Sequence, residues 1–104
     1  MMTPSEKQIE FLRTEINSQT ARMPWKELLR FFATGTVIFV SEELDLVDVG
    51  VQISIDNKAA VAQWMANNRV GLVTDEQAKV WLDADAALWT VVVKPWLLVQ
   101  SVKT

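Results

Sequence analysis

The 104-residue chain contains no cysteine and no histidine. Without cysteine it can form neither a disulfide, nor a thiolate zinc site, nor a redox-active thiol pair. Without histidine it lacks the most common general base and the most common metal ligand of proteins. We therefore expect no cofactor and no metal centre, and these absences disfavour an enzyme without excluding one.

Other features are also scarce. The three glycines, Gly35, Gly50 and Gly71, lie too far apart to form a phosphate-binding loop. The net charge of −3 provides no obvious basic surface, so we expect no nucleic-acid partner. The longest apolar run, residues 88–99, is interrupted by a lysine and a proline and falls short of the roughly 20 residues of a membrane helix. With no apolar signal segment at the N-terminus, we expect a cytoplasmic protein without a membrane partner.

Apolar residues, in contrast, are abundant, since they make up 50% of the chain. This fraction is far above that of disordered chains, and the length is typical of one domain with its own core. We therefore predict a single domain over residues 1–104. Within it, residues 1–20 form an N-terminal helix and its connection, and residues 21–101 form the main body.

Four segments have apolar residues at helical spacing. The first lies within residues 1–20, and the second begins at Pro24. A third helix is expected after Asp56. A fourth follows Thr74, which has a glutamine three residues later and so has the pattern of a capping box.

The remaining apolar segments have the pattern of β-strands. Residues 36–40 are β-branched and aromatic, and residues 46–55 alternate between aliphatic and polar or small side chains. Residues 88–93 are apolar on both faces, and residues 96–101 continue beyond Lys94–Pro95 as the same strand, bent, or as a further one. The order α-α-β-β-α-α-β predicts an α+β fold in which helices pack on one face of a small, mainly antiparallel sheet.

The mixed face of the second predicted strand holds the candidate site. Asp48 and Gln52 are its polar anchors, and Trp89 and Trp96, which flank the break at Lys94, are candidate walls of a pocket or interface. Asp48 is also the best candidate for carboxylate chemistry. It has no visible partner carboxylate and no activated nucleophile nearby in the sequence.

Residues 41–56 carry five carboxylates and neither lysine nor arginine. Oxygen ligands of this kind bind Mg²⁺ or Ca²⁺, but the spacing does not match a calcium-binding loop. We therefore interpret this segment as the charged, solvated tip of a hairpin, with a metal site as the alternative.

Three motifs together indicate a family. They are Pro-Trp-Lys-Glu-Leu at residues 24–28, Leu-Asp-Leu-Val-Asp-Val-Gly at residues 44–50, and Lys-Pro-Trp-Leu-Leu-Val-Gln at residues 94–100. In this order and spacing the chain resembles a bacterial family of short proteins classed as a domain of unknown function. The resemblance implies a bacterial, cytosolic, single-domain protein, and it brings no substrate, cofactor or catalytic residue.

The leading interpretation is a non-enzymatic, self-associating interaction module. Leu46 and residues 88–93 would leave aliphatic groups on the sheet face opposite the helices, and such a patch is rarely left bare. A second copy related by a two-fold axis would cover it, so we expect a homodimer, with another, unidentified protein as the further option. A small-molecule or metal-binding domain is the alternative function, and a carboxylate-dependent hydrolase is the third.

Overall fold

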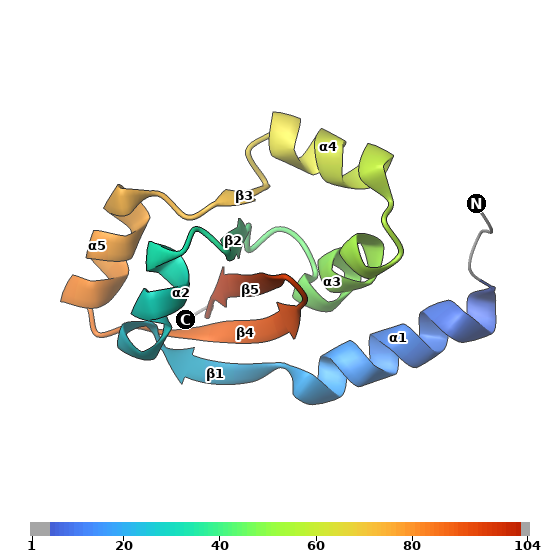
Figure 1. Cartoon of the computed structure of the whole chain (residues 1–104), viewed down its shortest axis with the longest axis horizontal. Coiled ribbons are helices and arrows are strands. Elements are labelled where there is room, and N and C mark those ends of the chain that lie inside the picture. Colours follow the sequence, from blue (N-terminus) through green and yellow to red (C-terminus); the bar gives the residue numbers. More distant parts are fainter. Residues whose placement is uncertain (1–4, 103–104) are drawn as a thin grey trace.

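The computed structural model describes residues 5–102 and has the α+β class that the sequence predicts (Figure 1). Helices and strands alternate along the chain around one five-stranded sheet. The elements are α1 (Glu6–Gln19), β1 (Ala21–Pro24), the 3₁₀ helix η1 (Trp25–Leu28), α2 (Leu29–Ala33), β2 (Val37–Val40), α3 (Leu46–Ser54), α4 (Lys58–Ala66), β3 (Val70–Leu72), α5 (Asp75–Asp83), β4 (Ala87–Val93) and β5 (Trp96–Ser101).

The sheet is mixed, with the strand order β1-β4-β5-β2-β3. The β5–β2 pair is parallel, and the other three neighbouring pairs are antiparallel. β4 and β5 form a hairpin whose turn contains the cis peptide bond between Lys94 and Pro95. The interruption at Lys94–Pro95 therefore separates two strands and does not bend a single one.

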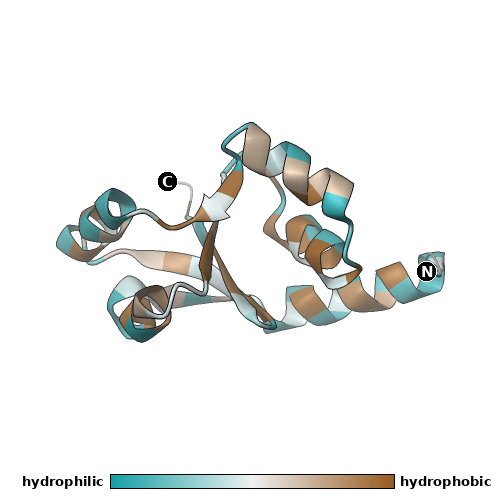
Figure 2. Cartoon of the chain, turned by 45° about the horizontal axis from the view of Figure 1, so that its top comes forward, coloured by the Kyte–Doolittle hydropathy of each residue, from teal (hydrophilic) through white to brown (hydrophobic). Residues whose placement is uncertain are grey.

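Helices cover both faces of the sheet, so the expectation of helices on one face is wrong (Figures 1 and 2). On one face, α1, α3 and α4 pack against a core that includes Val91 and Leu98. On the other face, η1, α2 and α5 pack against a core that includes Leu97 and Val99. Neighbouring residues of β5 point to opposite faces, and both faces are apolar, so each needs its own helical layer.

Residues 46–55 were expected to form a strand, and this prediction is wrong, because α3 occupies Leu46–Ser54. The side chain of Asp45 caps the helix by accepting a 3.0 Å hydrogen bond from the Val47 amide. Leu46, Val49 and Gly50 are buried at helical spacing, against α1 and the sheet. The mixed sheet face therefore does not exist, and the argument that an external partner must cover it fails with it.

The structure confirms several local predictions and adds two strands. The first predicted helix is α1, and Thr74 and Gln77 form the predicted capping box of α5. β1 and β3 are additional: both are short, and both lie at the edges of the sheet. No helix within residues 5–102 is long and apolar enough to cross a membrane.

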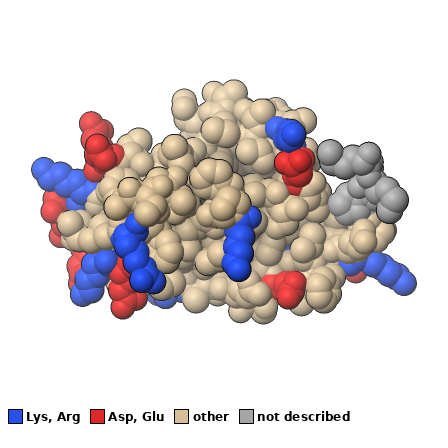
Figure 3. All heavy atoms as spheres, in the orientation of Figure 1, with Lys and Arg blue, Asp and Glu red and all other residues tan. Residues whose placement is uncertain are grey.

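Charged side chains are unevenly distributed over the surface. In Figure 3, lysine, arginine and acidic groups mix at the end that holds α5, whereas the surface over α4 is almost free of charge. The sequence explains this difference, because residues 59–68 contain no charged side chain. The uncharged surface lies next to the cavity described below.

Candidate functional site

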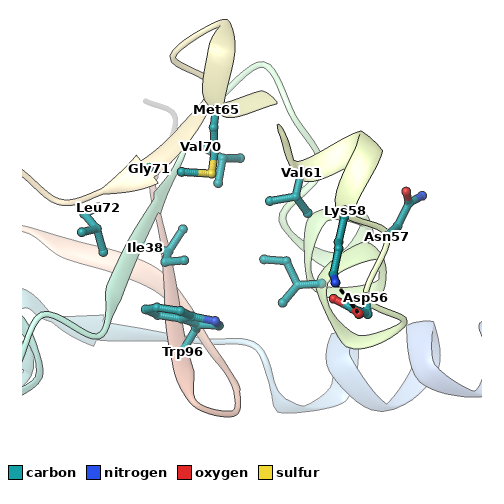
Figure 4. Close-up of a pocket in the computed structure, with 11 residues that line it drawn as sticks. Ile38, Asp56, Asn57, Lys58, Val61, Met65, Val70, Gly71, Leu72 and Trp96 are labelled. Atoms are coloured by element: carbon teal, nitrogen blue, oxygen red, sulfur yellow. Dashed lines mark ion pairs between the residues drawn. The ribbon is translucent and has the colours of Figure 1, made fainter. Parts of the chain in front are cut away.

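An open groove of about 350 Å³ lies between α4 and the sheet. This volume lies within the range of small-molecule pockets. Figure 4 shows Ile38 and Trp96 on the sheet side and Val61 on the opposite wall, from α4. The apolar lining residues are Ile38, Ile53, Val61, Met65, Val70, Leu72 and Trp96.

Two large apolar side chains of the groove are strongly exposed. Met65, on α4, is 53% exposed, and Leu72, on β3, is 59% exposed. Burying these side chains would be favourable, because it would remove apolar surface from water. The groove therefore presents apolar surface that a bound molecule would remove from water.

α4 forms one wall of the groove and is only partly buried by the rest of the chain. It is an almost entirely apolar segment, yet it contains no fully buried residue. An apolar helix is normally buried by the rest of its protein. Here α4 packs mainly along α3 and β3, and Val61 and Met65 face the groove (Figure 4).

The groove is charged only near the start of α4. Lys58 Nζ lies 3.9 Å from Asp56 Oδ2, and these two are the charged residues of the lining (Figure 4). Asn57 caps α4 by accepting a 3.2 Å hydrogen bond from the Ala60 amide. Asn57 also donates a 2.7 Å hydrogen bond to Gln52 Oε1, which ties the cap to α3. The groove thus has a polar end and an apolar body.

Of the residues predicted from the sequence, Trp96 lines this groove. Gln52 is connected to it only through Asn57. Asp48 lies one helical turn before Gln52 but accepts a 3.0 Å hydrogen bond from Arg13 Nη2 of α1. Asp48 therefore joins two helices and does not contribute to the groove.

Trp89 and Lys94 lie elsewhere. The Arg22 guanidinium is 5.0 Å from the centroid of the Trp89 ring, in a cation–π contact between β1 and β4. Trp89 and Gln100 line a separate hollow whose lining is more polar than that of the groove. Lys94 is exposed in the β4–β5 turn. The structure does not bring the five predicted residues together.

The acidic segment 41–56 is not a hairpin tip, because α3 fills much of it. Three of its five carboxylates pair with arginines from other parts of the chain: Arg13 pairs with Asp45 and Asp48, and Arg69 pairs with Glu43. Across residues 5–102, no three carboxylates lie close enough together to hold a metal ion. The structure thus offers no support for the alternative of a cation site here.

The sequence pattern of a family described as "Protein of unknown function (DUF2288)" matches residues 11–101. The chain belongs to this family. The solution NMR structure of PA1075 from Pseudomonas aeruginosa is similar to it, with 33% sequence identity, a TM-score of 0.80, and coverage of 99% of this chain and 95% of that chain. No curated protein matches the chain. The predicted family membership is confirmed, and the DUF2288 description brings no activity with it.

Most groove residues of this DUF2288 member were missed at the level of sequence. From the sequence, Ile38 is an ordinary core position of a predicted strand and Val61 of a predicted helix, and Val70 lies in no predicted element. Only the folded chain places these residues around one groove. The signal that was available was the run without charge at residues 59–68, because a surface helix normally carries charges on its outer side.

Proposed function

We propose that this protein is a non-enzymatic binding module of the bacterial cytoplasm whose groove holds the apolar body of a small organic ligand. The observation that carries the proposal is an open, apolar groove of about 350 Å³ beneath α4, a helix without a buried residue. Trp96 on the sheet side and Val61 on α4 form opposite walls, between which a ring or a branched aliphatic group fits (Figure 4).

The apolar body of the ligand must supply most of the affinity. The side chains of Lys58 and Asp56 are 83% and 60% exposed, so their ion pair is largely screened by water. Exposed pairs of this kind contribute about 0–1 kcal/mol. A charged group on the ligand would therefore contribute little to the affinity. Its main effect would be to orient the ligand with that group at the start of α4.

The groove contents favour binding over catalysis. Its ionisable lining residues, Asp56 and Lys58, pair with each other, and the lining contains no serine or threonine hydroxyl. General acid–base catalysis needs positioned groups aimed at a reacting atom. Asp48, the candidate for a hydrolase, lies outside the groove and is held by Arg13.

Titration with anilinonaphthalene sulfonate (ANS), a fluorescent probe with an apolar ring system and one anionic group, tests the proposal. We expect saturable binding by the native chain. Val61→Glu should weaken this binding by about tenfold or more, because a charge then enters an apolar site. Val80→Glu, on α5 at a position that is 63% exposed, is the matched control and should bind ANS like the wild type.

Two results would contradict the proposal. The first is the absence of saturable ANS binding to the native chain. The second is equal ANS affinity of the Val61→Glu and Val80→Glu chains. Near-ultraviolet circular dichroism of both variants checks that the tryptophan environments of the fold persist, since ANS also binds partly unfolded chains.

A further inference from the structure

The two edges of the sheet differ in how they are protected against pairing with another strand. β1 forms one edge and contains Arg22 and Pro24. A charge and a residue without an N–H group are common means of blocking an edge. β3 forms the other edge and contains only Val70, Gly71 and Leu72, so it has neither protection.

The free side of β3 presents backbone groups in a defined register. On the β2 side, the Arg69 carbonyl accepts a 2.7 Å hydrogen bond, and the Val73 amide donates one of 3.3 Å. Because bonded positions alternate along an antiparallel strand, the N–H and C=O groups of Val70 and Leu72 point away from β2. These groups are placed to pair with one further strand.

Gly71, between them, is not required by its own chain. A Cβ atom at this position would have no atom within 4 Å, and the residue is not among the glycines with positive φ. A glycine inside a strand weakens the strand and brings no side chain to it. Gly71 therefore adds neither a charge nor bulk that would protect this edge.

We propose that two copies of the chain pair antiparallel through β3, with the two Gly71 residues at the two-fold axis. In this register Val70 of one copy faces Leu72 of the other, and their outward N–H and C=O groups bond to each other. The two Gly71 residues then form the close, non-bonded pair, with Cα atoms about 4.5 Å apart. The strand sequence Val-Gly-Leu is thus complementary to itself, and the two sheets become continuous.

Charges at the ends of β3 favour the antiparallel arrangement. Arg69, which also pairs with Glu43, precedes the strand, and Asp75 and Glu76 follow it. Antiparallel pairing brings the basic end of one copy to the acidic end of the other, at both ends of the contact. Parallel pairing would bring like charges together.

The pairing also completes the rim of the groove. Val70 and Leu72 both line the groove, and Leu72 is 59% exposed. Opposite Val70 of the second copy, Leu72 would pack on the rim of that copy's groove, near its Met65. Each copy would thereby contribute a side chain to the binding site of the other. The backbone pairing itself does not depend on a ligand and goes beyond the proposed function.

Sedimentation equilibrium over the micromolar range tests the pairing. We expect the wild-type mass to rise with concentration from 11.8 kDa toward twice that value. Gly71→Lys should weaken the association several-fold, because the two lysines would lie directly opposite each other at the two-fold axis, where like charges repel. Val92→Lys is the control: this position on β4 is 52% exposed and lies away from β3, so association should be unchanged.

Hydrogen exchange gives a second readout that needs no variant. The Val70 and Leu72 amides should exchange more slowly at high protein concentration than at low concentration. The pairing would be overturned if the wild-type mass stayed at 11.8 kDa and amide exchange did not depend on protein concentration. This conclusion would hold whether or not the chain binds ANS. A Gly71→Lys chain that associates as tightly as the wild type would also overturn the pairing. A monomeric Gly71→Lys chain that still binds ANS would support the pairing and would leave the proposed ligand site intact.

Discussion

Replacing Gly50 with valine tests the packing of α3, the element that differs most from the sequence prediction. In the structure, a Cβ atom at Gly50 would lie 3.2 Å from Ile16 Cγ2 and 3.5 Å from Val93 Cγ2. Valine adds two methyl groups beyond that Cβ. Neither Ile16 nor Val93 can yield easily, because both are buried in the core between α1, α3 and the sheet.

The expected magnitude follows from two opposing effects. Overpacking a well-packed core costs about 1–3 kcal/mol. Valine has a higher helix propensity than glycine, and this offsets roughly 0.3–0.5 kcal/mol of that cost. Gly50→Val should therefore lower the free energy of unfolding by about 0.5–2.5 kcal/mol, which corresponds to a fall in Tm of roughly 2–20 °C for a domain of this size.

Urea unfolding at low micromolar concentration, followed by tryptophan fluorescence, measures this difference. Gly71→Val is the matched control, because a Cβ at Gly71 contacts nothing within 4 Å. The control should be as stable as the wild type or up to about 1 kcal/mol more stable, because Gly71 lies in β3 and valine is the better strand former. If residues 46–55 formed a strand, Gly50 would lie on its solvent side, and valine would raise the stability. A Gly50→Val chain at least as stable as the wild type would therefore refute the helical packing.

Two further predictions concern the core and the surface of the same face. Leu98→Ala removes a side chain with 0% exposure from the centre of the sheet and should cost about 2–5 kcal/mol in the same urea experiment; a loss below about 1 kcal/mol would contradict the central position of Leu98. A double-mutant cycle of Arg13→Ala and Asp48→Ala should give a coupling below about 1 kcal/mol that decreases with added salt, because these side chains are 44% and 38% exposed. A salt-independent coupling of several kcal/mol would instead assign Asp48 a buried role.

Elements with local signals could be predicted from the sequence. The capping box at Thr74 and Gln77 fixes the start of α5 through hydrogen bonds between residues three apart. The β-branched run before Ser41 forms β2, and Pro95 marks the turn between β4 and β5. In each case the determining contacts lie within a few residues of one another.

α3 was missed because two periodicities fit the same residues. Aliphatic residues at every second position of 46–55 match a strand, but Leu46, Val49 and Gly50 also match one face of a helix. The Asp45 cap and the contact between Gly50 and Ile16 decide in favour of the helix. The contact with Ile16 joins residues far apart in the chain, and the sequence pattern alone does not contain it.

The groove depends on long-range arrangement even more strongly. Trp96 was predicted as a pocket wall because it follows a break in a strand, and it does line the groove. The opposite wall comes from α4, whose position follows from its packing on α3 and β3. β3 itself has three residues and no periodic pattern, and the parallel pairing of β2 with β5 joins distant segments. Local signals do not specify these contacts.

The most direct test of the groove as a binding site is a titration of the isotope-labelled chain with ANS, followed by amide chemical shifts in ¹H–¹⁵N NMR spectra. We expect saturable shifts concentrated at the groove, at Ile38, Val61, Met65, Leu72 and Trp96. The amides around Asp48 and Lys94 should hardly move, because both residues lie outside the groove. Shifts spread evenly over the chain, or centred on the hollow beside Trp89, would contradict the assignment of the groove as the binding site.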